Sequence, residues 1–450
     1  MNLKVILFHY IFLLLFRHLQ CVKTDEQSES NFTVVKNWPF YSDFGQISGV
    51  GIDSYDNIYV FHRASRQWDS NTFSVNNTFL GQGPITKETI VVLEPKSGSL
   101  LGKTGKNRFF LPHGLTVDHE DNVWVTDVAL HQVFKFSPFK LKSKDNIDLR
   151  QPLLTLGVPL TPGSDEKHFC KPTDIAVDRK TNDFYVSDGY CNSRIIKFDK
   201  NGKLLLIIGR STIGDFSKNM YMLNLPHALA MSQTEQLLYV ADRENFRTLS
   251  YSFLTGKFNR TYQENFNDRV FSITYASGNN YNSSDGILFA LINHQSYSRI
   301  SVYDTKSGKK INFKMDQILT NPHDLAVSIN GRYCYVVELN PFKIWKLEIN
   351  FAAEQFHEKN ILNQSKVSIQ ETNNNDNNKS AEKLLSKTKT EQIENGNTFY
   401  AIGLVIIIIS VGLILFTYHY YKTKAGNKRY GFKRLMVEND DEDTYSDVEN

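Results

Sequence analysis

The chain has 450 residues and carries 51 Lys and Arg against 48 Asp and Glu, so its formal net charge is only +3. No basic face of the kind that binds phosphate backbones is evident, and the composition therefore excludes nucleic acid as an expected partner.

Residues 1–21 are predicted to be a secretory signal peptide. Lys4 precedes an apolar run at 5–16, which polar residues follow, and this run is too short to span a membrane. Residues 22–45 form an N-terminal segment. Within it, Thr33-Val34-Val35 is expected to supply the outer strand that closes the domain that follows.

Residues 46–350 contain one pattern repeated six times. Each unit has two alternating apolar strands separated by a turn rich in Asp, Asn and Gly. The first strands are predicted at 48–53, 113–118, 173–178, 227–231, 271–275 and 323–327, and the second at 57–61, 122–126, 183–187, 237–241, 287–290 and 333–337. Units of roughly 45–65 residues with three or four strands are typical of propeller blades. We therefore expect an all-β, six-bladed β-propeller, since two separate β-sandwiches would not explain six copies of one motif.

The remaining chain is predicted to anchor the propeller in a membrane. Residues 351–397 are rich in Asn, Gln, Glu, Lys and Ser, which indicates a disordered stalk. Residues 398–418 are apolar and long enough for one transmembrane helix, and the basic residues at 422–434 begin a cytoplasmic tail, 419–450. We expect a single-pass type I protein of the secretory pathway, at the secretory-granule membrane and the cell surface. The alternative is a buried core helix at 398–418, but such helices rarely lack every charged residue over this length.

Cysteines and glycosylation motifs agree with this compartment. If Cys21 leaves with the signal peptide, Cys170, Cys191 and Cys334 remain. We expect a Cys170–Cys191 disulfide because both flank the same repeat unit, and a buried, inert thiol at Cys334 within an apolar run. Six N-glycosylation motifs all lie on the predicted luminal side, at Asn31, Asn76, Asn259, Asn282, Asn363 and Asn378.

Three histidines share one repeat position, each after a proline. His113, His227 and His323 open the first strands of units two, four and six. The first strand of each blade lines the channel of a propeller, so residues on alternate blades lie roughly 120° apart about its axis. Three converging imidazoles are a typical zinc site with an open fourth position. Repeat ancestry is the alternative explanation, but it does not account for the Ser, Thr and Phe at the intervening positions.

A second cation site is predicted just past this repeat position, in the first strands of units one, two and six. The carbonyls of Val50 and Leu115 are expected to face the channel, and the carboxylate of Asp324 follows His323. Backbone oxygens with a carboxylate suit a hard cation such as Ca²⁺. The alternative role for Asp324 is a cap at the strand end.

Three long polar side chains follow the predicted second strands, at the rim of the channel. Arg63 and Arg243 each offer a planar fork that suits a substrate carboxylate. Tyr190 offers a phenol for general base catalysis. The alternative is that all three are ordinary surface residues whose apolar stems lie on the protein.

From residue 44 to about 347 the chain closely resembles the peptidyl-α-hydroxyglycine α-amidating lyase family. The segments that carry the resemblance, in order, are Phe61-His62-Arg63 with Trp68-Asp69, Gly83-Pro84-Ile85, 111–115, 124–134, 168–174, 187–194 and 241–245. The resemblance implies a propeller of NHL-like repeats. It also implies zinc held by the three histidines, calcium held by Val50, Leu115 and Asp324, and a disulfide between Cys170 and Cys191.

The resemblance further implies roles for the rim residues. Arg63 and Tyr190 match the family's catalytic pair, and Arg243 matches a substrate-contacting arginine. Asn321 stands at a substrate-binding position where the family often has Met. A second family disulfide is missing, because its positions correspond to Tyr239 and Ser250 here.

The implied function is a lyase that cleaves peptidyl-α-hydroxyglycine to a C-terminally amidated peptide and glyoxylate, the second step of neuropeptide amidation. The resemblance begins only near residue 44, so a separate peptidylglycine monooxygenase is expected to supply the substrate. The alternatives are a non-catalytic, membrane-tethered NHL propeller that acts as a binding module and a calcium-dependent propeller of the lactonase type.

Overall fold

The computed structural model describes residues 29–143, 145–209, 219–281 and 286–352. The chain divides into a unit of residues 1–360 and a second unit, 361–450, of which no residue is described. The predicted signal peptide, the transmembrane segment, the cytoplasmic tail, all but two residues of the stalk, and the motifs at Asn282, Asn363 and Asn378 therefore lie outside the described residues. Among the described residues, no helix is both long and apolar enough to cross a bilayer.

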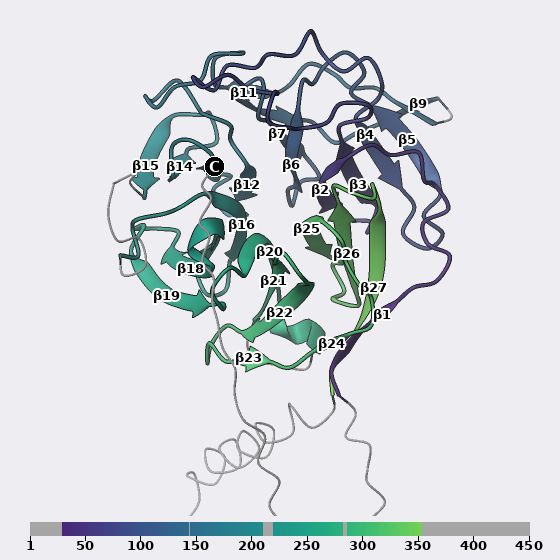
Figure 1. Cartoon of the computed structure of the whole chain (residues 1–450), viewed down its shortest axis with the longest axis vertical. Helices are drawn as coiled ribbons and strands as arrows, with labels where there is room; N and C mark the ends of the chain where they lie inside the picture. Colours follow the sequence, from purple (N-terminus) through teal and green to yellow (C-terminus); the bar gives the residue numbers. More distant parts are fainter. Residues whose placement is uncertain (1–28, 144, 210–218, 282–285, 353–450) are drawn as a thin grey trace, which may run out of the picture. The chain divides into compact units, whose positions relative to one another are not determined.

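Six mainly antiparallel sheets form the six blades that the sequence predicts. The first strands of the blades are β2 (Ile47–Ile52), β6 (Pro112–Val117), β12 (Asp174–Val177), β16 (Pro226–Ser232), β20 (Arg269–Ala276) and β25 (Pro322–Val327). Each first strand contacts the first strand of the next blade, and β25 contacts β2, so the ring is closed. Figure 1 shows these six strands facing the centre of the ring.

The second and third strands form the middle of each sheet. The second strands are β3 (Ile58–His62), β7 (Val123–Asp127), β13 (Phe184–Asp188), β17 (Leu237–Asp242), β21 (Ile287–Asn293) and β26 (Tyr333–Glu338). The third strands are β4 (Ile90–Leu93), β8 (Gln132–Phe136), β14 (Arg194–Phe198), β18 (Arg247–Ser252), β22 (Ser298–Asp304) and β27 (Ile344–Asn350). Second strands such as β3, β7 and β13 are buried at every residue, since neighbouring blades cover both faces. This explains their nearly continuous apolar sequences.

The outer strands are less buried than the inner strands, and several of them alternate between more buried and more exposed residues. They are β5 (Leu100–Thr104), β11 (Leu154–Leu156), β15 (Leu204–Ile208), β19 (Phe258–Gln263) and β23 (Lys310–Ile311). In β15 and β19 half-buried and exposed residues alternate, because one face of an edge strand packs on the next blade and the other meets solvent. Blade one also gains two strands that the sequence did not predict, β9 (Leu141–Ser143) and β10 (Asp145–Ile147), with β10 parallel to β5.

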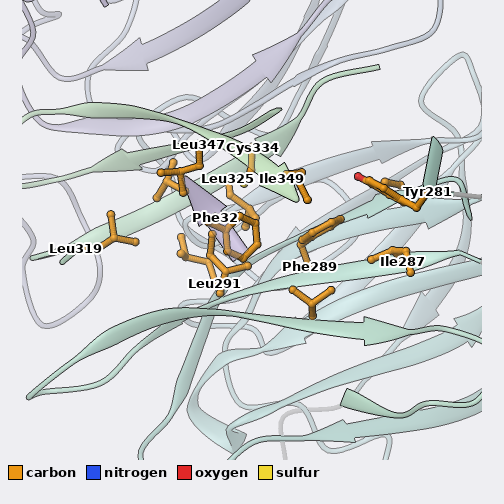
Figure 2. Packing of buried hydrophobic residues seen from close by; sticks show 14 residues of the cluster. Phe32, Tyr281, Ile287, Phe289, Leu291, Leu319, Leu325, Cys334, Leu347 and Ile349 are labelled. Carbon is orange, nitrogen blue, oxygen red and sulfur yellow. The ribbon is translucent and has the colours of Figure 1, made fainter. Parts of the chain in front are cut away.

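The predicted closure by the N-terminal segment is confirmed. Strand β1 (Asn31–Val34) pairs antiparallel with β27, and Phe32 lies opposite Ile349. A short strand, β24 (Lys314–Met315), adds to the other edge of β1. Figure 2 shows Phe32 among Phe289 and Leu291 of blade five and Leu347 of blade six. The predicted buried thiol, Cys334, lies in the same cluster and is fully buried.

Candidate metal centre and active site

The three repeat-equivalent histidines converge in the channel. The ring centroids of His113, His227 and His323 form a nearly equilateral triangle with sides of 4.9, 4.9 and 5.0 Å. One ligand atom from each ring lies within 4.8 Å of the others. In each of these strands the pairing register shifts directly at the Pro-His pair. Such a β-bulge changes the direction of a side chain, and here it accompanies histidines that point toward one another.

The intervening blades fix the tautomer of these rings. The Nδ1 atom of His113 lies 2.9 Å from the carbonyl oxygen of Thr173, that of His227 lies 2.5 Å from Phe271, and that of His323 lies 2.8 Å from Ser48. A carbonyl only accepts, so each Nδ1 carries the proton and each Nε2 keeps its lone pair. Metal-binding histidines are commonly oriented in this way.

Burial keeps the three imidazoles neutral. It lowers the pKa of His323 to about 3, with the charges of Arg63 and Arg243 adding to the effect. Burial and the neighbouring histidine and arginine charges also lower the pKa of His113 and His227 well below the usual range. Metal ions bind the neutral imidazole, so three buried Nε2 lone pairs at one point fit Zn²⁺ with a vacant fourth position.

Tyr190 lies against the open side of this triad. Its hydroxyl is 3.1 Å from Nε2 of His113 and 3.3 Å from Nε2 of His227. Its ring packs on Trp68, with 4.8 Å between the ring centroids. The disulfide between Cys170 and the adjacent Cys191 holds the turn that carries it.

Arg63 is a buried cation beside Tyr190. Its side chain donates from Nε to the carbonyl of Pro112 at 3.0 Å and from Nη1 to Gln46 Oε1 at 2.9 Å. Within the described part of the chain, the buried Nη2 has no partner. Burial lowers the pKa of Arg63 to about 10, although the nearby Tyr190 and Asp127 act in the opposite direction. The guanidinium therefore stays charged at neutral pH. An unpaired buried donor is costly, which suits a site that receives an anion.

Arg243 faces the same space from blade four. It begins the short 3₁₀ helix η1 (Arg243–Asn245), and its Nε donates to Glu244 at 2.8 Å. Its guanidinium carbon lies 4.7 Å from the centre of the Phe271 ring and 5.5 Å from that of Tyr190. Asn321 lies two residues before His323, and its side-chain oxygen accepts a bond from Asn293 at 3.2 Å. The structure thus brings together Arg63, Tyr190 and Arg243 around the triad.

The predicted calcium ligands line the channel together with a carboxylate that the sequence interpretation missed. Val50, Leu115, Asp174 and Asp324 all border a cavity of about 530 Å³. Asp324 accepts from the backbone N–H of Val50 at 2.9 Å, and Asp174 accepts from that of Leu229 at 2.8 Å. Asp174 follows Thr173 just as Asp324 follows His323, so the repeat register was the signal that could have found it.

The two channel carboxylates carry raised pKa values. Burial raises the pKa of Asp324 to about 7. Burial and, second, the charge of Asp324 raise the pKa of Asp174 to about 8. A bound cation would remove this penalty, so the two channel carboxylates fit a hard cation such as Ca²⁺.

Comparison with known proteins assigns the chain to a family. The NHL repeat family matches residues 169–198. Two proteins of Drosophila melanogaster named peptidyl-alpha-hydroxyglycine alpha-amidating lyase are similar to this chain. Lyase 2 is 39% identical over 332 residues, which cover 70% of this chain and 74% of the relative. Lyase 1 is 39% identical over 345 residues, which cover 72% of this chain and 61% of the relative.

A longer relative matches the same region. Peptidyl-glycine alpha-amidating monooxygenase A of Xenopus laevis is 40% identical over 324 residues, which cover 69% of this chain and 32% of the relative. The chain therefore spans about a third of the length of that relative. The match to lyase 2 covers 74% of that relative at 39% identity. The predicted site residues also converge in one propeller, and the two observations together show common descent. The chain belongs to the peptidyl-α-hydroxyglycine α-amidating lyase family.

Proposed function

We propose that the protein is a zinc-dependent lyase that converts peptidyl-α-hydroxyglycine into a C-terminally amidated peptide and glyoxylate. The observation that carries the proposal is the Tyr190 hydroxyl, which lies within hydrogen-bonding distance of Nε2 of both His113 and His227. Membership in the lyase family supports the same reaction. Two guanidiniums near that hydroxyl match a substrate that ends in a carboxylate.

The chemistry then follows from the residues around the triad. Arg63 and Arg243 hold the substrate carboxylate, which orients the hydroxyl-bearing carbon toward Tyr190. Tyr190 accepts the hydroxyl proton as the general base, and the positive charge of Arg63 lies beside it. The C–N bond breaks with its electrons moving to the amide nitrogen, which takes up the proton that Tyr190 accepted, so amide and glyoxylate leave and Tyr190 returns to its starting state. Zn²⁺ held by His113, His227 and His323 would supply Lewis acidity toward the substrate oxygen.

The proposed calcium has a structural role. Val50, Leu115 and Asp324 belong to blades one, two and six, and a cation held by their oxygens would tie these blades together. Asp174 of blade three would contribute negative charge from across the channel. Asn321 is proposed to border the bound substrate, since it immediately precedes Pro322 and His323.

The setting of the enzyme is also part of the proposal. We infer a type I protein of the secretory pathway, anchored at the secretory-granule membrane or the cell surface. A separate peptidylglycine monooxygenase would supply the substrate for neuropeptide amidation. Among the described motif asparagines, Asn76 and Asn259 are exposed and Asn31 is half-buried. All three are proposed glycosylation sites.

Glyoxylate release from a synthetic peptidyl-α-hydroxyglycine tests the function directly. We expect the purified protein to release glyoxylate and amidated peptide in equal amounts. Metal analysis should find about one zinc, and a chelator should abolish turnover until Zn²⁺ is restored. A metal-loaded protein that binds the peptide without releasing glyoxylate would instead support the alternative function, a non-catalytic binding module.

A further inference from the structure

The carboxylate of Glu244 lies between two arginines at the edge of the candidate site. One oxygen accepts from Nε of Arg243 at 2.8 Å, and the other accepts from Nε of Arg269 at 2.8 Å. Burial raises the pKa of Glu244, but the charges and hydrogen bonds of Arg243 and Arg269 bring it below its usual value. The carboxylate therefore stays ionised and paired with both arginines.

The backbone of Arg243 and Glu244 is hydrogen-bonded to the segment that leads into β16, the strand that carries His227. The N–H of Arg243 donates to the carbonyl of Leu225 at 3.2 Å, and that of Glu244 donates to Asn224 at 3.1 Å. These acceptors lie two and three residues before His227. Asp242, which is fully buried, also accepts from the N–H of Asn224 at 2.7 Å. The backbone of Arg243 is therefore held in place by the residues just before His227.

Two kinds of contact together determine where the guanidinium points. The Phe271 and Tyr190 rings, 4.7 and 5.5 Å from its carbon, restrict the tilt of its plane. These ring contacts alone would still let the Arg243 guanidinium rotate within its own plane. The hydrogen bond from Nε to Glu244 removes this freedom. Within the described residues the two terminal nitrogens have no protein partner, so both remain available to a ligand.

We propose that Glu244, itself held by Arg269, is a positioning residue that aims the two terminal nitrogens of Arg243 at the substrate carboxylate. This inference rests on the proposed function, because the carboxylate is that of the peptidyl-α-hydroxyglycine. Glu244 touches neither the substrate nor the triad and acts through Arg243 alone. A contact made equally in the ground state and the transition state affects binding more than turnover.

Binding of an inert peptide that ends in glycine tests the inference without requiring turnover. Its dissociation constant is measured for the zinc-loaded wild-type protein and for Glu244→Ala, Glu244→Gln, Arg243→Ala and the double variant Arg243→Ala/Glu244→Ala. We expect Glu244→Ala to weaken binding about tenfold or more, the range for a hydrogen bond to a charged group. Glu244→Gln keeps an acceptor for Nε and should stay within about threefold of wild type.

The double variant separates positioning from a general loss of structure. If Glu244 acts through Arg243, removing it from the Arg243→Ala protein should have no further effect. A peptide with a terminal carboxamide should lose little affinity on Glu244→Ala. The matched control is Glu348→Ala, which breaks the ion pair between Glu348 on β27 and Arg332, the residue before β26, and should leave binding unchanged.

Three results would overturn the inference. They are unchanged binding in Glu244→Ala, an equal loss for the carboxylate and carboxamide peptides, and additive losses in the double variant. Kinetics with the hydroxylated substrate should show the same pattern as a raised KM with kcat within about threefold. If the wild-type protein binds the glycine peptide but releases no glyoxylate, the proposed function fails, while the binding ratios still decide the role of Glu244.

Discussion

At the scale of single residues, the Tyr190 hydroxyl is the group whose removal should separate turnover from binding. Tyr190→Phe keeps the ring that packs on Trp68 at 4.8 Å but removes the oxygen near the two Nε2 atoms. We expect kcat to fall by about 10²–10⁴, the usual contribution of a general base, with little change in KM. Steady-state kinetics and zinc content check this. A variant that loses kcat together with zinc would show that Tyr190 supports the metal site instead.

His131 gives the fold a dependence on pH that is independent of the metal site. It is fully buried, and its Nδ1 accepts from the N–H of Lys171 at 3.0 Å. Burial and the charge of Lys171 lower its pKa to about 4. Between about pH 6.5 and 4 the unfolded chain therefore binds a proton that the folded protein does not. The free energy of unfolding must fall as the pH falls through this range.

His131→Asn should remove this pH dependence. Asn can accept from Lys171 and tolerates the left-handed backbone at this position, where φ is 56°. Between pH 7.5 and 5 the free energy of unfolding should fall by about 2 kcal/mol less in the variant than in the wild-type protein. Denaturant unfolding at both pH values measures the difference. The same loss in both proteins would mean that His131 does not titrate as its surroundings indicate.

The sequence predicted those site residues that repeat in register or follow a strand. The three histidines, Arg63, Tyr190 and Arg243 were found in this way, and the structure places them together. Asp174 was missed even though it shares its repeat position with Asp324. Gln46 and Glu244 were missed for a physical reason, because their role depends on a contact with one particular arginine and no periodic pattern encodes such a contact.

At the scale of elements, strand positions were predictable but local departures from the ideal strand were not. Alternation and turn residues placed the first two strands of each blade within a few residues of their observed bounds. The register shift at each Pro-His pair leaves no periodic trace, although it aims the histidines. The pairing of β10 with β5 joins residues from different repeats, and only the folded ring brings them together.

The disulfide between Cys170 and Cys191 supports two parts of the site at once. Cys191 follows Tyr190, and Cys170 lies three residues before Thr173, whose carbonyl accepts from His113. Replacing both cysteines by Ala should lower the free energy of unfolding by about 3 kcal/mol, the value for a loop of this length. It should also lower kcat, because Tyr190 loses its support.

Cys334→Ala provides the control for that variant. Its thiol is buried in the cluster between blades five and six, away from the triad, so the substitution should reduce stability without changing kcat. Kinetics well below the unfolding transition compare the two proteins. If the double cysteine variant keeps full kcat, the rest of the turn positions Tyr190 without the disulfide.

At the scale of the whole molecule, the ring depends on a strand that comes from the other end of the domain. Phe32 on β1 is 1% exposed, and its ring lies 4.8 Å from that of Phe313 and 6.3 Å from that of Phe289. Its neighbours come from blades five and six, so it contributes both to the last sheet and to the contact between two blades. Its loss should therefore weaken the closure of the ring as well as leave a cavity.

We expect Phe32→Ala to lower the free energy of unfolding by about 3–5 kcal/mol, the range for a buried aromatic side chain. Phe40→Ala makes the same substitution at a side chain that is 83% exposed and should change the free energy by less than about 0.5 kcal/mol. Denaturant unfolding of both variants measures the difference. Because β1 lies on blade six, which also carries His323, the weakened ring should lose zinc at a lower denaturant concentration than wild type. Equal stability of the two variants would show that the ring stays closed without the Phe32 side chain.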